Sequence, residues 1–156
     1  MEEKTRAHKQ FEKWRETKNE KYLLKSYKKG FLEAKCVYAR KYLDYIEEDL
    51  VQESLQALKQ IFESNKQEID NTPYLSLYGV ARTLAEYYKD KDLAEARKWF
   101  IESESCFMCT GPRELATRYA NGCREYGIEK DTTKAQEWIE VARSRGSPES
   151  MLNNIL

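Results

Sequence analysis

The chain has 156 residues, of which 35% are charged and only nine are glycine or proline. This composition is typical of a helical protein and argues against a β-sandwich or a barrel. Lysine plus arginine equals aspartate plus glutamate, 27 against 27, so the net charge argues against nucleic acid or an anionic membrane as the partner. The charge is unevenly distributed, since residues 1–41 hold 13 basic and 6 acidic side chains.

Residues 1–29 are expected to form a basic helical cap or arm. Phe11 and Trp14 give a charged helix over residues 2–18 a narrow apolar edge, and a second short helix is expected to end at Gly30. A cap would cover the first of several stacked helical hairpins, as the terminal units of such arrays usually must. The alternative is a partly frayed basic arm.

Residues 30–156 are expected to form one domain of helical hairpins. The first hairpin spans about 31–64, and Leu55, Leu58, Ile61 and Phe62 give its second helix an apolar stripe. A polar linker follows, and Asn71-Thr72-Pro73 predicts the start of the next helix. That helix opens a second hairpin, over about 73–105.

A third hairpin, over about 111–145, has the clearest pattern. Asp131 is the predicted N-cap of its second helix, and Gly146 is expected to end that helix. Ser147-Pro148 then predicts a closing helix over 147–156, with Pro148 as its first residue. The spacing Asp-xxx-Ala-xx-Trp occurs at both 92–99 and 131–138, which indicates an internal repeat.

This pattern resembles the Sel-like repeat, a relative of the tetratricopeptide repeat. The family's motif is matched in order by Leu115, Ala116, Tyr119, Gly122, Gly127, Ile128, Asp131, Lys134, Ala135, Trp138, Ala142 and Gly146. Ala116 stands where the family prefers glycine, and two extra residues separate Gly122 from Gly127. The resemblance implies an all-α fold, a short right-handed α-solenoid whose first helices line a concave face. It also places Trp99 and Trp138 in the core.

The resemblance further implies that partners bind through first-helix residues that do not pack. Transferred to this sequence, those partner-binding positions are Arg40, Arg82, Glu86, Lys89, Arg113, Thr117 and Asn121. Arg82 and Arg113 occupy corresponding positions and are expected to form an exposed basic ridge, so reversing their charge should leave folding intact. The alternative is that all seven are merely solvated helix positions.

No pattern predicts catalysis, because the chain has a single histidine and no glycine-rich phosphate loop or serine elbow. Cys106-Phe-Met-Cys109 is the one motif that suggests chemistry, but a structural zinc site needs four ligands. We therefore expect no enzyme activity, no cofactor and no metal, with small packing residues as the favoured interpretation of these cysteines. The acidic run Glu47 to Asp49 could bind a cation, but a solvated turn at a helix end is the favoured interpretation.

The favoured function is a non-enzymatic adaptor or scaffold that binds a protein or peptide. The alternative is a bacterial immunity or inhibitor protein that neutralises a toxin or enzyme by binding it. A third hypothesis is a regulator that touches nucleic acid with the basic section from Lys4 to Lys41. No small-molecule substrate is expected, and a polar N-terminus without an apolar run predicts a cytoplasmic protein that lacks a signal peptide or membrane span.

Overall fold

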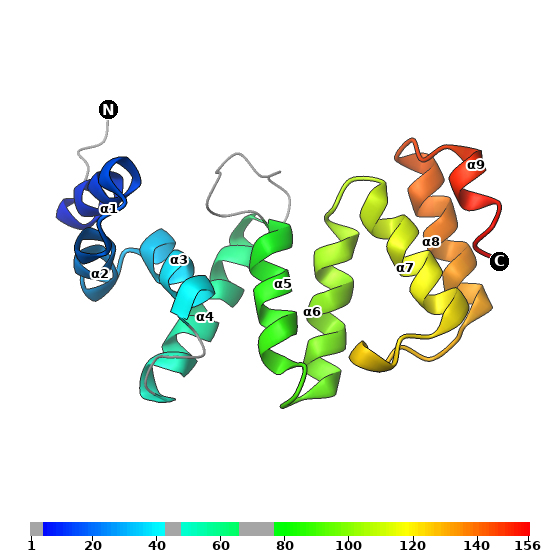
Figure 1. Cartoon of the computed structure of the whole chain (residues 1–156), viewed down its shortest axis with the longest axis horizontal. Coiled ribbons are helices and arrows are strands. Elements are labelled where there is room, and N and C mark those ends of the chain that lie inside the picture. Colours follow the sequence, from blue (N-terminus) through cyan, green and yellow to red (C-terminus); the bar gives the residue numbers. More distant parts are fainter. Residues whose placement is uncertain (1–4, 43–47, 66–76) are drawn as a thin grey trace. The chain divides into compact units, whose positions relative to one another are not determined.

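The computed structural model describes residues 5–42, 48–65 and 77–156, and 77% of them are helical with no strand among them (Figure 1). The all-α prediction is thereby confirmed, whereas the right-handed solenoid stays a prediction. The chain divides into two compact units, residues 1–76 and residues 77–156. In the described ranges no helix is both long and apolar enough to cross a membrane.

The first unit contains two pairs of helices that are adjacent in the sequence. The pairs are α1 (Arg6–Thr17) with α2 (Glu20–Lys28) and α3 (Leu32–Tyr42) with α4 (Glu48–Asn65). Thr5 Oγ1 accepts from His8 N at 3.1 Å and caps α1, and Asn19 Oδ1 accepts from Lys21 N at 3.2 Å and caps α2. Lys18, at φ 56°, makes the sharp turn between these two helices.

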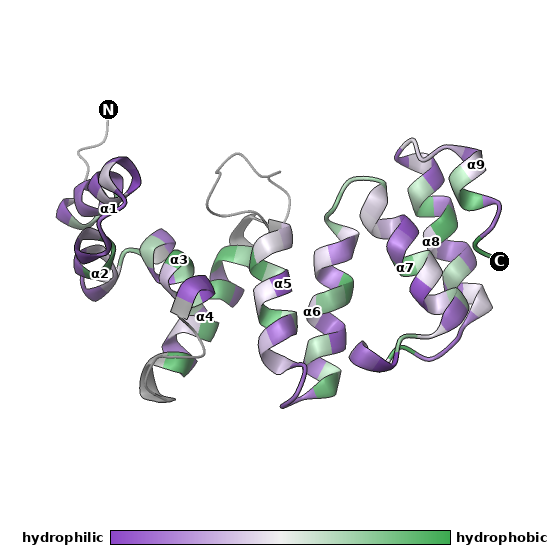
Figure 2. Cartoon of the chain, in the orientation of Figure 1, coloured by the Kyte–Doolittle hydropathy of each residue, from purple (hydrophilic) through white to green (hydrophobic). Residues whose placement is uncertain are grey.

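The predicted apolar edge of the first helix forms the core of the first helix pair. Phe11 and Trp14 are buried against Leu23 and Tyr27 of α2, and the cluster continues to Ala34 and Val37 of α3. Because these side chains recur every three or four residues, they share one face of each helix, and the charged residues between them lie on the outside. In Figure 2, α1 and α2 are mostly hydrophilic, with hydrophobic residues interspersed.

The second unit is a series of hairpins built from α5 (Leu77–Tyr88), α6 (Leu93–Ser105), α7 (Thr110–Asn121) and α8 (Thr132–Ser144). Helix α5 packs against α6, α6 against α7, and α7 against α8. The 3₁₀ helix η1 (Arg124–Tyr126) lies in the α7–α8 connection and contacts α6. The predicted helix start at Asn71-Thr72-Pro73 lies outside the described residues.

The repeated Asp-xxx-Ala-xx-Trp pattern has the same local structure in both places. Asp92 (φ −148°, ψ 97°) accepts from Glu95 N at 3.2 Å, and Asp131 (φ −150°, ψ 100°) accepts from Lys134 N at 3.0 Å. Each aspartate is therefore the N-cap of the second helix of its hairpin, as predicted for Asp131. The alanine of each copy is fully buried.

The two tryptophans of the pattern differ in burial, which corrects the prediction that both belong to the core. Trp99 is 1% exposed, whereas Trp138 is only half-buried at the edge of a cluster around Ile139 and Leu152. The two tryptophans differ because their helices have different neighbours. Helix α6 lies between α5 and α7, while α8 packs against α7 and the four-residue α9 (Glu149–Leu152).

The closing helix is shorter than predicted. The pattern predicts a helix over 147–156, but α9 spans only Glu149–Leu152, and Pro148 is its N-cap at ψ 140° rather than its first helical residue. Asn153 and Asn154 follow as a turn, consistent with the low helix propensity of asparagine. Ser147 is buried and precedes the helix instead of capping it.

Candidate functional site

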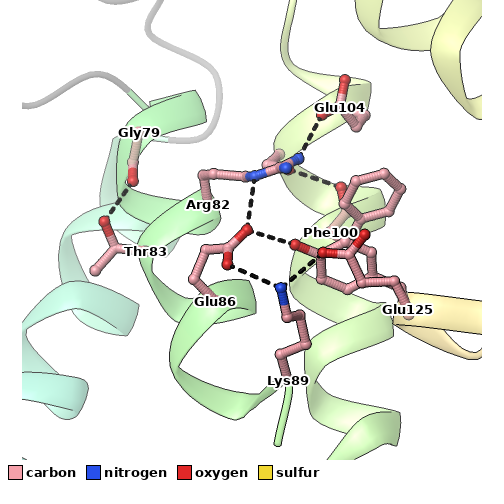
Figure 3. Close-up of polar contacts among 10 residues, drawn as sticks. Gly79, Arg82, Thr83, Glu86, Lys89, Phe100, Glu104 and Glu125 are labelled. Atoms are coloured by element: carbon pink, nitrogen blue, oxygen red, sulfur yellow. Dashed lines mark hydrogen bonds and ion pairs between the residues drawn. The ribbon is translucent and has the colours of Figure 1, made fainter. Parts of the chain in front are cut away.

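The predicted binding residues of α5 and of the turn that follows it form a polar network with α6 and η1 (Figure 3). Arg82 Nη1 lies 3.0 Å from Glu104 Oε1, and Arg82 Nε lies 3.4 Å from Glu86 Oε1. Lys89 Nζ lies 3.5 Å from Glu86 Oε2 and 2.7 Å from Glu125 Oε1. Arg82 and Lys89 are predicted to bind a partner, but in the structure they pair with carboxylates of the chain itself.

An aromatic pair lies beneath this network. The rings of Tyr126 and Phe100 stack with centroids 4.2 Å apart, and the Arg82 guanidinium lies 5.2 Å from the Phe100 centroid and 5.6 Å from that of Tyr126. The Tyr126 hydroxyl donates to Glu86 Oε1 at 2.6 Å. Because Tyr126 is only 2% exposed, this bond satisfies a polar group that water cannot reach.

The pKa values of Glu104 and Glu86 are shifted in opposite directions, the first by burial and the second by hydrogen bonding. Burial raises the pKa of Glu104, and the attraction of Arg82 offsets that rise only in part. The hydrogen bond from Tyr126 lowers the pKa of Glu86, helped by Lys89 and Arg82. The network is thus a partly buried set of charges that holds α5, α6 and η1 together.

Arg82 is consequently not the freely exposed charge that the sequence predicts. Its partner Glu104 has a side chain that is only 6% exposed, so reversing Arg82 would leave a buried carboxylate facing a second negative charge. This contact leads us to expect a loss of stability when Arg82 is reversed, whereas the sequence alone predicts none. Sequence reasoning missed both Glu104 and Tyr126, because they lie 22 and 44 residues from Arg82 and carry no motif.

The predicted residues of α7 bind within the chain as well. Arg113 Nη1 donates to Ser147 Oγ at 3.2 Å and lies 2.9 Å from Met151 Sδ. Thr117 Oγ1 donates to the Arg113 carbonyl and Asn121 Nδ2 to the Thr117 carbonyl, each at 3.1 Å. Arg82 and Arg113 therefore point toward different elements. The seventh predicted residue, Arg40, is exposed on α3 of the first unit.

A cleft of about 500 Å³ opens between α6 and the α7–α8 connection. Glycines shape this connection: Gly122 and Gly127 have φ values of 77° and 64°, and the segment between them is closed by paired backbone bonds of Cys123 and Ile128. The next residues run back along α7, where Asp131 N donates to the Tyr119 carbonyl at 2.8 Å. The connection thus becomes one wall of the cleft.

Three basic side chains, Arg97, Lys130 and Lys134, line the cleft. Arg97 Nη1 donates to the Gly127 carbonyl at 2.9 Å, and Lys134 Nζ lies 5.5 Å from the Tyr119 ring centroid. Among the described residues, none of the three cations forms an ion pair. The cleft can therefore accept an anionic group without first breaking an internal salt bridge.

The other residues that line the cleft limit the charge and polarity of a ligand that fits there. Ile101, Ile128 and Tyr119 supply apolar surface, and the carboxylates of Glu129 and Asp131 reduce the excess of positive charge to one. Sequence reasoning missed this site, although Lys134 and Asp131 were identified as repeat positions. No local signal reveals it, because three separate segments form its walls.

The cysteines are all free thiols. Cys36 and Cys123 are buried, whereas Cys106 and Cys109 are half-buried in the turn between α6 and α7. Burial raises the pKa of the Cys36 thiol to about 12. Within the described part of the chain no group of three or more histidine, cysteine, aspartate or glutamate side chains is placed to hold a metal ion. The side chains of Glu47 to Asp49 lie outside that part.

Comparisons with protein-family models, with curated proteins and with solved structures give no match for this chain.

Proposed function

We propose that the chain is a non-enzymatic binding module for a protein or peptide, built on Sel-like hairpins that stack as a short right-handed solenoid. Support for the repeat comes from the equivalent caps at Asp92 and Asp131 and from the buried alanine that follows each of them. Stacked hairpins of this kind present extended surfaces on which other proteins bind.

The observation that carries the proposal is the set of basic side chains in the cleft. In the Arg82 network each cation already has a carboxylate within 3.5 Å, so that surface offers a partner little unsatisfied charge. Arg97, Lys130 and Lys134 have no such partner among the described residues. A volume of about 500 Å³ is in the range that binds a compact ligand or a few residues of a peptide.

The lining favours one carboxylate beside an apolar side chain. Arg97 commits Nη1 to the Gly127 carbonyl and keeps its other N–H groups for an acceptor, which suits a carboxylate. Ile101 and Ile128 lie in the same cleft and suit an aliphatic or aromatic neighbour. Because Glu129 and Asp131 also line the cleft, a strongly acidic stretch is disfavoured relative to a single charge.

The face of α5 and α7 stays a predicted contact surface, but we favour the cleft over it. Glu86 is 47% exposed along its side chain and Asn121 is exposed, so both remain accessible to a partner. Their hydrogen bonds are made within the chain, however. A partner at this face would gain packing and rim contacts rather than new ion pairs.

A selection from a displayed random peptide library, with the full chain as target, tests the proposal. Selected peptides should contain an acidic residue next to an apolar one, and Lys130→Glu with Lys134→Glu should weaken binding by about tenfold or more, or about 1.4 kcal/mol, in fluorescence anisotropy. Lys91→Glu with Arg124→Glu is the matched control. It makes the same charge change in the same unit, at residues that do not line the cleft.

Asn121→Arg is the corresponding probe of the α7 face, since it adds bulk and charge at an exposed position. Loss of binding in this variant, with normal binding by the cleft variant, would move the contact surface to α5 and α7. The selection is repeated with the Lys130→Glu, Lys134→Glu variant as target. If no peptide is enriched on the wild-type chain relative to this variant, the cleft is not a binding site.

A further inference from the structure

The first helix pair carries a high local charge. Helices α1 and α2 with their flanking residues, 5–29, contain nine basic and three acidic side chains. Figure 2 shows these two helices mainly in the hydrophilic colour. The balanced charge of the whole chain does not cancel this patch, because charges are screened within about 8–10 Å at physiological salt. The balanced net charge of the chain therefore does not exclude nucleic acid from this surface.

Three lysines of this pair converge on one tyrosine ring. Lys13 of α1 and Lys21 and Lys25 of α2 place their Nζ atoms 4.6, 5.0 and 5.8 Å from the centroid of Tyr22. A second such ring, Trp14, has Lys18 at 4.8 Å and Lys41 at 5.6 Å. Trp14 itself is buried, so Tyr22 is the ring that these lysines surround at the surface. We call Lys13, Lys21, Lys25 and Tyr22 the Tyr22 cluster.

Nearby carboxylates do not neutralise the Tyr22 cluster. Glu20 of α2 pairs with Lys41 at 2.7 Å, and Glu12 of α1 lies 3.6 Å from His8. Among the described residues, the three lysines of the cluster have no ion pair. The hydrogen bond from Lys13 lowers the pKa of the Tyr22 hydroxyl, helped by the positive charges of Lys13 and Lys21. Like charges held together without a counter-ion repel one another, and a bound anion removes that repulsion.

The same surface lacks what a membrane-binding helix needs. An interfacial helix must expose a broad apolar face to the acyl chains. The large apolar side chains Phe11, Trp14, Leu23 and Tyr27 are instead buried between the helices. What remains outside is a group of flexible ammonium groups beside the partly exposed Tyr22 ring, and positive charge next to an aromatic ring is the combination that single-stranded nucleic acids bind.

We propose that the α1–α2 pair binds the phosphate backbone of a single-stranded nucleic acid through Lys13, Lys21 and Lys25, with Tyr22 beside the bound strand. The binding is independent of base sequence, since ammonium groups neutralise phosphates and do not read base edges. This site is separate from the cleft and does not depend on the proposed peptide binding.

The test measures anisotropy of a fluorescein-labelled single-stranded RNA of mixed sequence against the full chain, over a series of salt concentrations. Lys13→Gln with Lys21→Gln and Lys25→Gln should weaken binding at low salt by about tenfold or more. Each neutralised phosphate contributes about 0.7 to the slope of log K against log salt for a single strand, so the slope should fall by about 2. Far-ultraviolet circular dichroism checks that the variant folds.

The matched control changes Lys9, Lys28 and Lys29 to glutamine, which removes the same charge from exposed positions of the same helix pair. It should lose much less affinity than the cluster variant. The proposal is overturned if the wild-type chain does not bind the RNA at low salt, or if both triple variants lose affinity equally. It is also overturned if vesicles containing phosphatidylserine bind in a cluster-dependent way while the RNA does not.

Discussion

Replacing Arg82 by glutamine should destabilise the second unit more than an ordinary surface substitution does. The side chain of Arg82 is 34% exposed, but its partner Glu104 is 6% exposed. Arg82→Gln therefore removes the charge partner of a carboxylate that water hardly reaches. A buried polar group left unsatisfied costs about 1–3 kcal/mol, and more when it is charged. The guanidinium also covers the Phe100 and Tyr126 rings, which adds about 0.5–1 kcal/mol.

Together these terms give an expected loss of about 1.5–4 kcal/mol in the free energy of unfolding at neutral pH. Glu104→Gln should cost less than about 1 kcal/mol, because an amide oxygen still accepts from Arg82 and no charge is buried. The double variant should then be more stable than Arg82→Gln alone by about 1–2 kcal/mol. Urea denaturation followed by circular dichroism measures all four proteins of the cycle.

The pH dependence gives a second readout of the same pair. The folded-state pKa of Glu104 is raised above its ordinary value of 4.5, mainly by burial. Stability from this group is therefore fully present below the unfolded-state pKa and is lost as the pH rises through the folded-state pKa. Removing Arg82 raises that pKa further, so the deficit of Arg82→Gln should be small below pH 4.5 and largest at neutral pH.

Two results would contradict the claim that Arg82 stabilises the second unit by pairing with Glu104. If Arg82→Gln changed the unfolding free energy by less than about 0.5 kcal/mol, Arg82 would be an ordinary exposed side chain and its pairing with Glu104 unimportant. If the deficit were the same at acidic and neutral pH, the loss would come from packing and not from the charge of Glu104.

Three further predictions concern the core and the thiols. Trp99→Ala should cost about 3–5 kcal/mol in urea denaturation, while Trp138→Ala should cost clearly less because its ring is half-buried; equal losses would contradict the difference in burial. Gly111→Ala should prevent normal folding, since a Cβ there would lie 1.7 Å from a backbone oxygen of α6, and a melting temperature like that of the wild type would contradict this packing. In native alkylation at neutral pH followed by mass spectrometry, Cys36, whose pKa is about 12, should react far more slowly than half-buried Cys109, and equal rates would contradict its burial.

The sequence predicts those features of the fold that depend on neighbouring residues. The N-cap at Asp131 and the glycine turns involve groups a few positions apart, and the structure has them. The short closing helix and the partial exposure of Trp138 were not predictable in this way. Both depend on what lies beyond the last hairpin, and a repeat pattern carries no information about that.

The candidate site was less predictable for the same reason. A helical pattern places Arg82 and Glu86 on one face but does not say that Glu104 and Tyr126 meet them there. In the first unit, the i, i+4 spacing of Lys21 and Lys25 predicts that they are neighbours on α2. The addition of Lys13, from the other helix of the pair, becomes visible only once α1 and α2 are packed together.

The most direct test of the proposed function is hydrogen–deuterium exchange of the full chain with and without a selected peptide. If the peptide binds in the cleft, exchange should slow in residues 127–134 and in the part of α6 that carries Arg97 and Ile101. Protection confined to α5 and the exposed end of α7, with residues 127–134 unchanged, would contradict it and would place the partner on the other predicted face.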